Sequence, residues 1–193
     1  PAGEVTMETT GGLDPVITVN GHSYAHRKTA NTNFALLVSA TFSPPFREPI
    51  AYGKYLARIA NIISGGVIVQ RWGDLSQGRI STSNSIEEGA VKPTLKSATP
   101  GDLGYVIPYR FLKGINEMLS AMDKLAPGVA SPDTLLYGVE VKFYSSRLEL
   151  TENLETEIPN LFAIGDGAGV SRGLIQAAAS GVVAAREIIR KNA

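Results

Sequence analysis

The sequence predicts a mixed α+β fold in two parts, a β-rich domain with covering helices and a C-terminal strand–turn–helix unit. Three observations carry this prediction. β-rich runs with turn signals occupy residues 3–42. Residues 49–64 and 108–125 repeat apolar side chains at helical spacing. Residues 158–169 join a short apolar run to a glycine-rich turn, and a helix of small residues follows.

The composition is that of an ordinary globular protein, with 44% hydrophobic and 19% charged residues among 193. Eighteen basic and eighteen acidic residues cancel, which argues against general electrostatic binding of nucleic acid or of an anionic membrane. The lack of cysteine excludes disulfides, cysteine nucleophiles and thiolate metal sites. No apolar stretch reaches transmembrane length and no signal peptide is visible, so we expect a cytoplasmic protein.

The first elements are expected to be strands. Residues 3–9 alternate apolar and polar side chains, and residues 16–19 form a second run that Asn20-Gly21 follows. Asn-Gly between β-rich runs favours a hairpin turn, because both central residues need positive φ. Residues 34–42 are almost continuously apolar and predict a strand buried on both faces. Because the sequence begins at Pro1, without methionine and within strand-like residues, we expect a piece of a longer protein.

The middle of the chain predicts a helix, a strand and a long loop. Apolar residues recur at helical spacing over residues 49–64, and Gly65-Gly66 stops the helix. Residues 67–72 predict a strand, and Trp72, the only tryptophan, is expected in the core. Residues 73–104 are rich in Gly, Ser, Thr and Pro without periodicity, which indicates a loop of functional or mobile character.

The C-terminal half predicts two more helices and three strands. Residues 108–125 carry one apolar face after a proline suited to a helix start. Alternation over residues 139–143 indicates a half-exposed strand, which residues 148–150 continue on a following strand or hairpin arm. Residues 161–164 are expected to form the last strand and residues 174–190 the last helix.

The glycine turn could be mistaken for a dinucleotide-binding fingerprint, G-x-G-x-x-G. Counted from Gly165 the sixth position is Val170, and counted from Gly167 it is Arg172, so the spacing fails. The second strand that would carry an acidic residue for the ribose does not follow either. The bland alternative is that a small-residue helix after a strand only packs tightly in a core.

Another pattern fits these residues better. I-P-N-L-F-A-I-G-D-G at residues 158–167, followed by a small-residue helix, resembles the C-terminal flavin-binding segment of two-domain FAD-dependent oxidoreductases. Further segments along almost the whole chain are similar to a bacterial and archaeal family of FAD-dependent dehydrogenases. They are Val19-Asn20-Gly21, Ser23-Tyr24, Asn31-Thr32-Asn33, residues 78–83, Gly138-Val139-Glu140 and Ser145-Ser146.

The resemblance implies a second, substrate-side cap domain over residues 1–147 and the C-terminal segment of a Rossmann-like FAD-binding domain over residues 148–193. That family also has an N-terminal βαβ unit with the glycine loop for the ADP pyrophosphate, which this sequence lacks. The implied function is therefore FAD-dependent oxidation or reduction, with hydride transfer to or from the flavin and a small-molecule substrate. NAD(P)H is a candidate electron donor, and the chain alone is expected to be inactive and not to hold FAD.

The resemblance also assigns the cofactor-binding residues. Asp166, between Gly165 and Gly167, would contact the ribityl chain of FAD, and the helix beginning at Gly173 would point at the pyrimidine side of the ring. Backbone N–H groups at Gly173, Leu174 and Ile175 would stabilise the negative charge that reduced flavin carries near N1 and O2. The family often has glutamate at the position of Asp166 and glycine around Ser171-Arg172, and this sequence departs from it there.

Substrate contacts are less determined. Tyr24, His26 and Arg27 could donate protons or anchor a substrate near the flavin; the alternative is an exposed hairpin. Arg79, with the hydroxyls of residues 81–83, could bind a carboxylate or phosphate, and the alternative is a plain Ser/Thr-rich loop. Ser145 and Ser146 could approach the cofactor or form a turn.

The sequence also bears on metal binding and on functions other than redox catalysis. His22 and His26 lack further ligands, so no metal site is expected. Two rival functions remain beside the oxidoreductase: a flavin-free binding or scaffold module that has lost the redox role, and a flavoprotein that acts on RNA.

Overall fold

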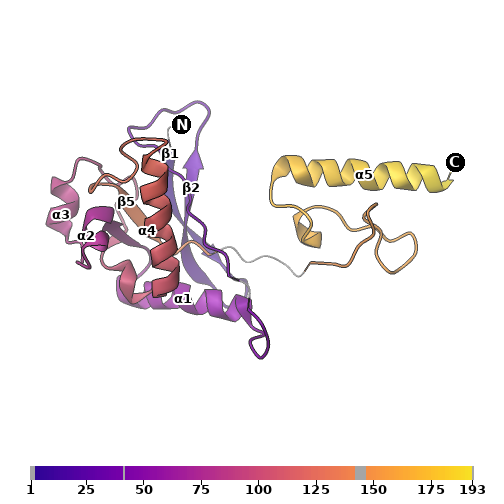
Figure 1. Ribbon diagram of the computed structural model, residues 1–193, viewed down its shortest axis with the longest axis horizontal. Helices are drawn as coiled ribbons and strands as arrows, with labels where there is room; N and C mark the ends of the chain where they lie inside the picture. The colour runs from indigo at the N-terminus through magenta and orange to yellow at the C-terminus, as the bar shows by residue number, and fades with distance from the viewer. Residues whose placement is uncertain (1–2, 41, 142–146, 193) are drawn as a thin grey trace. The chain divides into compact units, whose positions relative to one another are not determined.

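The computed structural model describes residues 3–40, 42–141 and 147–192 of the chain. The chain forms two compact units, Pro1–Val141 and Lys142–Ala193 (Figure 1). Helices and strands both occur, which confirms the predicted mixed α+β class. No helix in the described part of the chain is both long and apolar enough to cross a membrane.

The first unit begins with an antiparallel hairpin of β1 (Gly3–Thr10) and β2 (Val16–Ser23). The chain reverses at Gly11-Gly12, whose φ angles of 109° and 64° favour glycine. The predicted turn at Asn20-Gly21 is therefore wrong, because both residues lie inside β2. The Gly-Gly pair supplies the positive φ angles that a tight turn needs, so the reversal does not require Asn20-Gly21.

Asn33 explains why position 21 is nevertheless a glycine. A Cβ on Gly21 would lie 3.2 Å from the Asn33 side chain, and one on Gly3 would lie 2.6 Å from it. The Asn33 amide donates to the carbonyls of Glu4 at 2.7 Å and of His22 at 3.3 Å. The two glycines thus make room for an amide that bridges both strands of the hairpin.

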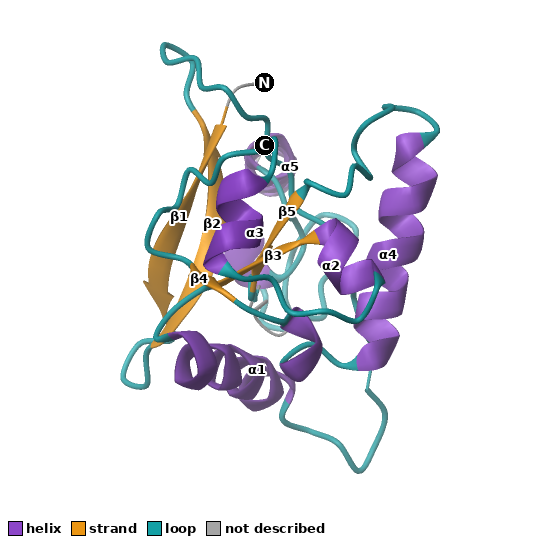
Figure 2. Cartoon of the chain, turned by 90° about the vertical axis from the view of Figure 1, so that its left-hand side faces the viewer, coloured by secondary structure: helices purple, strands orange, loops and turns teal. Residues whose placement is uncertain are grey.

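The second sheet has the strand order β4 (Thr99–Pro100), β3 (Ile68–Arg71), β5 (Leu135–Gly138), as Figure 2 shows. β4 runs parallel to β3, and β5 runs antiparallel to it. The strand predicted over residues 67–72 is confirmed.

Both long helices of this unit match their predictions. α1 (Pro49–Ser64) ends at Gly65 in the left-handed conformation, and α4 (Tyr109–Asp123) begins directly after Pro108. The Asn61 side chain on α1 exchanges two hydrogen bonds of 2.9 Å with the backbone of Ile17 on β2. This contact fixes α1 against the hairpin.

The core of the first unit draws on α1, β3 and the segments that follow β4 and β5. Its buried members are Ala60, Ile68, Leu103, Val106 and Val139. The Val19 N–H donates to the Val139 carbonyl at 3.1 Å, which joins the hairpin to this core.

The strand predicted over residues 34–42 is wrong. Residues 34–40 and 42 belong to no strand, and Phe34, Leu37 and Phe42 are 49%, 59% and 40% exposed. The ring of Phe42 instead packs against Phe46 and Tyr52 at centroid distances of 4.3 and 5.4 Å. A continuous apolar run predicts burial in general, and here aromatic packing takes the place of a strand ladder.

The loop predicted over residues 73–104 is also wrong. The segment contains α2 (Trp72–Ser76), α3 (Ser83–Glu88), β4 and the 3₁₀ helix η1 (Leu103–Tyr105). Elements this short span too few residues for an apolar period to be visible in the sequence. Side-chain caps mark the starts of two of them, Thr82 for α3 and Asp102 for η1.

The strand predicted over residues 139–143 is displaced toward the N-terminus. β5 ends at Gly138, where a Cβ would lie 2.6 Å from the Leu103 side chain. Within the described residues 139–141 no ladder continues. Residues 142–146, with the rest of the predicted strand and Ser145 and Ser146, lie outside the described residues.

The second unit is built around α5 (Leu174–Asn192), which confirms the predicted last helix. The strands predicted over residues 148–150 and 161–164 are wrong, because the described residues of this unit contain only one isolated bridge, between Glu155 and Phe162.

The backbone around that bridge explains why it stays isolated. Leu154 and Asn160 have φ angles of 69° and 66°. Positive φ at these two residues bends the chain out of the extended conformation on both arms, so a ladder cannot lengthen.

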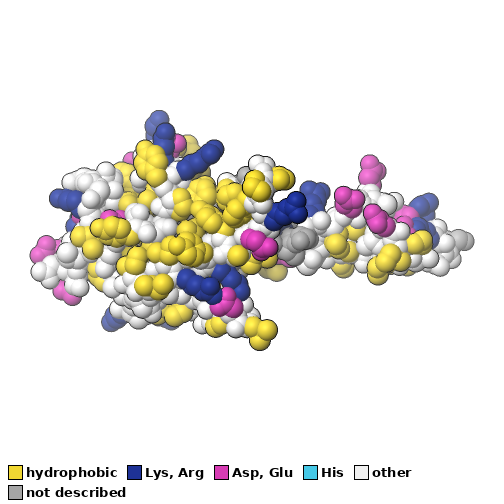
Figure 3. All heavy atoms as spheres, turned by 90° about the horizontal axis from the view of Figure 1, so that it is seen from below, with side chains coloured by type: hydrophobic (Ala, Val, Ile, Leu, Met, Phe, Trp, Pro, Cys, Tyr) yellow, Lys and Arg dark blue, Asp and Glu magenta, His cyan; other side chains and the backbone are white. Residues whose placement is uncertain are grey.

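Exposed apolar side chains gather on the face of the first unit seen in Figure 3. In the α1 region they include Phe46, Ile50, Tyr55, Ile62 and Ile63. The second unit exposes apolar side chains of its own. On α5 these include Leu174, Ile175, Val182 and Ile189.

Candidate functional site

The glycine turn of the second unit is compact. Gly165 has φ 71° and ψ −163°, the 3₁₀ helix η2 (Asp166–Ala168) follows, and Gly169 closes it at φ 72°. A residue with a Cβ at position 165 or 169 would have to adopt a positive φ, which L-amino acids rarely do. The predicted turn thus has a physical requirement for glycine at both of its ends.

The turn is fixed to the first half of α5 by a serine. Ser180, 9% exposed, accepts a hydrogen bond from the Gly165 N–H at 2.9 Å and donates one to the Ala177 carbonyl at 2.7 Å. A Cβ on Gly165 would lie 3.9 Å from the Ala177 side chain, and one on Gly181 would lie 3.7 Å from Ile164. Small residues on α5 therefore serve to bring the helix close to the turn.

Asp166 is the acidic residue of the turn, and a second serine holds it. The buried Ser171 hydroxyl donates to Asp166 Oδ1 at 2.6 Å. Arg172 donates through Nη1 to the Ser171 carbonyl at 3.0 Å. Asp166 itself is exposed, so solvent and ligands can reach this residue while Ser171 orients its carboxylate.

The start of α5 offers backbone donors. The first hydrogen bond of the helix runs from the Ala177 N–H to the Gly173 carbonyl at 2.9 Å. The preceding N–H groups, at Leu174 and Ile175, therefore have no acceptor within the helix. The side chains of these two residues are 91% and 81% exposed.

Two ion pairs lie at the other end of α5, one to Glu155 outside the helix and one within the helix. Lys191 Nζ contacts both oxygens of Glu155 at 2.6 and 2.5 Å and lies 5.6 Å from the centroid of the Phe162 ring. The hydrogen bond from Lys191 lowers the pKa of Glu155. Glu187 accepts two hydrogen bonds from Arg190, which lower the pKa of Glu187 and raise that of Arg190.

In the first unit, the predicted substrate residues Tyr24 and Arg27 lie together beyond the end of β2. The Arg27 guanidinium carbon is 5.8 Å from the centroid of the Tyr24 ring, and Arg27 Nη2 is 2.5 Å from Glu4 Oε1. The ring of His22 stacks on Tyr24 at 6.4 Å. The pair is exposed and carries a positive charge already matched by Glu4.

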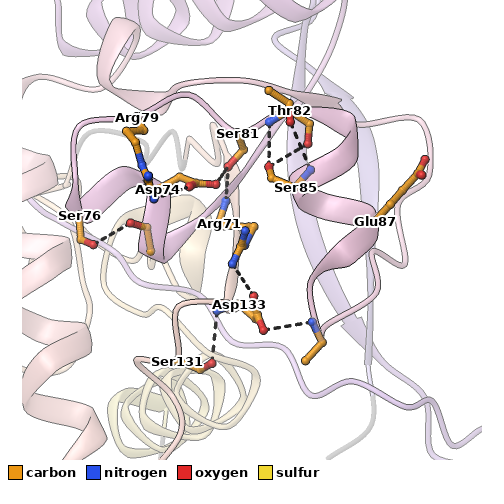
Figure 4. A network of polar contacts seen from close by, with 12 residues as sticks. Arg71, Asp74, Ser76, Arg79, Ser81, Thr82, Ser85, Glu87, Ser131 and Asp133 are labelled. Carbon is orange, nitrogen blue, oxygen red and sulfur yellow. Dashed lines mark hydrogen bonds and ion pairs between the residues drawn. The ribbon is translucent and has the colours of Figure 1, made fainter.

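Arg79 lies elsewhere, in the polar network of Figure 4. Its Nη2 is 3.4 Å from Asp74 Oδ1, and its own side chain is 61% exposed. Asp74 Oδ2 accepts a hydrogen bond from the buried Ser81 hydroxyl at 2.7 Å, and Ser81 Oγ accepts from the Arg71 N–H at 2.9 Å. Asp74 thus connects Arg79 to the Ser81 hydroxyl, which also accepts a hydrogen bond from the backbone of β3.

The remaining hydroxyls near Arg79 have a local role. Thr82 Oγ1 accepts from the Ser85 N–H at 3.2 Å, and Ser85 Oγ accepts from the Thr82 N–H at 2.9 Å. This reciprocal arrangement is a capping box for α3. The use of Arg79 for a substrate anion stays a prediction.

Gln70 joins the backbone segments around this polar network, a role that the sequence pattern does not predict. Fully buried on β3, it donates through Nε2 to the Arg79 carbonyl at 2.8 Å and accepts through Oε1 from the Leu103 N–H at 2.8 Å. Burial also raises the pKa of Tyr137 on the neighbouring strand to about 12. The only signal in the sequence is a glutamine inside an apolar strand.

The histidines are not brought together as metal ligands. β2 ends at Ser23, so His26 lies beyond the strand, and His22 Nε2 is 3.2 Å from Glu8. Among the described residues no group of three His, Cys, Asp or Glu could hold a metal ion. Trp72, expected in the core, is only partly buried and donates through Nε1 to Asn116 on α4 at 3.1 Å.

Comparison with known proteins identifies the family to which the chain belongs. The model of the family described as "FAD-dependent protein, C-terminal domain-like" matches residues 1–143, which is the whole of the first unit and more than half of the chain. The chain belongs to this family. Its membership confirms the resemblance to an FAD-dependent protein as far as the C-terminal domain is concerned.

This FAD-dependent C-terminal domain is also similar to a protein of Clostridium beijerinckii whose name is "Uncharacterized protein". The two are 32% identical over 187 residues, which is 89% of this chain and 33% of the relative. The chain thus spans about a third of the length of that relative. The glycine turn at Gly165–Gly169 lies beyond the residues that the family model matches.

Proposed function

We propose that this chain is the C-terminal part of a longer FAD-dependent oxidoreductase, in which it caps the flavin and completes its site. The observation that carries the proposal is the family match, which concerns the C-terminal domains of FAD-dependent proteins. The relative, which is about three times as long as the aligned part, supports the idea of a longer protein. When bound, FAD supplies a ring that accepts or donates hydride, which the side chains of this sequence cannot do.

The glycine turn fits the cofactor. A Cβ on Gly167 would meet no described atom within 4 Å, so the turn leaves open space beside Asp166. A carboxylate accepts hydrogen bonds only, which suits the hydroxyl groups of the ribityl chain. Asp166, held by Ser171, would therefore bind the ribityl chain.

The start of α5 fits the flavin ring. A helix N-terminus carries roughly half a positive charge and unbonded N–H donors. The N–H groups of Gly173, Leu174 and Ile175 would face the carbonyl oxygen of the pyrimidine part. Their role is to stabilise negative charge there without any side-chain movement.

The first unit would cover the flavin and select the substrate. Tyr24 and Arg27 are our candidates for substrate contacts, because an aromatic ring and a guanidinium lie together and exposed at the end of β2. Arg79 is a third candidate, being 61% exposed at the rim of the network around Asp74. NAD(P)H is the proposed electron donor for the full-length protein.

The proposal is tested on the full-length protein. It should purify with visible flavin absorbance. Asp166→Ala should lower the affinity for FAD about tenfold or more, since a charged hydrogen-bond acceptor for the ribityl chain is lost. Glu152→Ala, at an exposed acidic residue of the same unit, serves as the matched control and should leave the affinity unchanged.

Two outcomes would contradict this function. A full-length protein that neither contains nor takes up FAD would leave a binding or scaffold module as the better description. Unchanged FAD occupancy in Asp166→Ala would remove the role of Asp166 while leaving the flavoprotein assignment intact.

A further inference from the structure

We propose that Ser171 is a positioning residue of the flavin site, which acts through Asp166 and does not itself touch the cofactor. The inference rests on the proposed function of Asp166. It starts from a contact between two residues five apart in the sequence, on either side of the closing glycine of the turn. The Ser171 hydroxyl lies 2.6 Å from Asp166 Oδ1.

The direction of this hydrogen bond is determined by chemistry. An ionised carboxylate has no proton to give, so the serine must be the donor. Hydrogen bonds to a charged acceptor are short and about twice as strong as neutral ones, and 2.6 Å lies in that range. Ser171 is 5% exposed, so water has little access to compete for the hydroxyl.

The geometry gives the bond a consequence for the carboxylate. Asp166 is exposed and its χ2 torsion is broad in the absence of a partner. A donor fixed on Oδ1 selects one orientation of the carboxylate plane and so determines where Oδ2 points. A binding group that is already oriented loses less conformational entropy when the ligand arrives.

Ser171 is itself held in place by its backbone. Arg172 Nη1 donates to the Ser171 carbonyl at 3.0 Å, and Gly169, just before, is buried with φ 72°. The hydroxyl is therefore presented by a constrained loop and not by a mobile one. The position of this loop thus determines, through the Ser171 hydroxyl, how the carboxylate of Asp166 is oriented.

The test is a double-mutant cycle on the full-length apoprotein. Flavin fluorescence measures the Kd for FAD of each variant. Ser171→Ala should lower the affinity for FAD about three- to tenfold, the size of one ordinary hydrogen bond, because Ser171 only orients the carboxylate that binds FAD. In an Asp166→Ala background, the same change should have no further effect, because its target is gone. Thr156→Ala removes another hydroxyl of the unit and should leave the Kd unchanged in both backgrounds.

Each other outcome overturns the inference. An equal loss in both backgrounds makes Ser171 a purely structural residue, and no loss in either makes the contact irrelevant to FAD. Ser171→Gly is measured in the same cycle, and failure of both variants to fold assigns Ser171 to the scaffold. A wild-type protein that takes up no FAD overturns the proposed function instead, which the first titration reveals.

Discussion

Single polar side chains connect distant segments in both units. Gln70 joins β3 to the backbone of Arg79 and Leu103, and Ser180 joins the glycine turn to α5. Each of these side chains is buried, so a lost hydrogen bond leaves a buried polar group unpaired. Such a side chain therefore contributes more to stability than an exposed ion pair such as Lys113–Glu117.

Gln70→Ala is expected to destabilise the first unit by about 2–4 kcal/mol, because it leaves the Leu103 N–H without an acceptor and opens a cavity. Urea unfolding followed by the fluorescence of Trp72 reports on this unit, since no other tryptophan occurs. Gln77→Ala, at an exposed glutamine, should change the free energy of unfolding by about 0.5 kcal/mol or less. Equal effects of the two variants would show that the Gln70 network contributes nothing.

At the candidate site, the sequence predicts the residues with backbone requirements better than the residues that support them. Gly165 and Gly169 stand out because the turn needs positive φ there. Ser171 and Ser180 do not, because a serine reveals its partner only when the fold brings that partner close. The same holds for Asn33, whose amide lies between two strands and has no local signal.

Among elements, the three long helices and the strands β1, β2 and β3 could be predicted, whereas the short helices α2 and α3 and the positions of the other strands could not. α1, α4 and α5 carry an apolar period over fifteen or more residues, which is legible without tertiary information. Residues 34–42 and 161–164 have strand-like composition, but their described residues form no ladder, only the single bridge between Phe162 and Glu155. Strand formation depends on a partner that a local sequence pattern does not contain.

The C-terminal end of α5 should respond to acid through Glu155. Its pKa is lowered in the folded chain, so the ion pair contributes stability above the ordinary value of 4.5 and loses it as the pH falls through the lowered pKa. Glu155→Gln should therefore speed amide exchange in the last turns of α5 at about pH 7, and the difference should shrink below about pH 4.5.

A pair in the first unit provides the control for this effect. Glu117 and Lys113 are 3.7 Å apart and largely exposed, so Glu117→Gln should alter exchange little at either pH. A Glu155→Gln effect that persists unchanged at low pH would exclude the ion pair as its cause.

The start of α5 allows a test of backbone donation to the flavin ring. Proline is tolerated in the first turn of a helix but lacks an N–H, so Leu174→Pro deletes one donor and keeps the helix. In the full-length flavoprotein we expect its midpoint potential to fall by about 20–40 mV, since the reduced form loses a hydrogen bond. Leu174→Ala keeps the N–H and is the matched control; equal potentials in both variants would place the helix start away from the ring.

At the scale of the whole molecule, the two units differ in what supports their proposed role in flavin binding. The family match covers the first unit, whereas the residues proposed to contact ribityl and ring all lie in the second. The chain has no glycine-rich phosphate loop with the dinucleotide spacing, so the pyrophosphate and the adenosine part of FAD would need another part of the protein.

We therefore expect the 193-residue chain alone not to retain FAD. Contacts to ribityl and ring hydrogen-bond acceptors are few, and each contributes only about 1 kcal/mol net, which corresponds to weak binding. Titration of the purified chain with FAD, followed by flavin fluorescence, should give no saturation at micromolar concentration, while the full-length protein saturates at one equivalent. Riboflavin in place of FAD is the control, because it lacks the pyrophosphate and adenosine; the chain should bind the two equally weakly. Stoichiometric binding of FAD by the chain alone would contradict this expectation and show that the 193 residues contain a complete site.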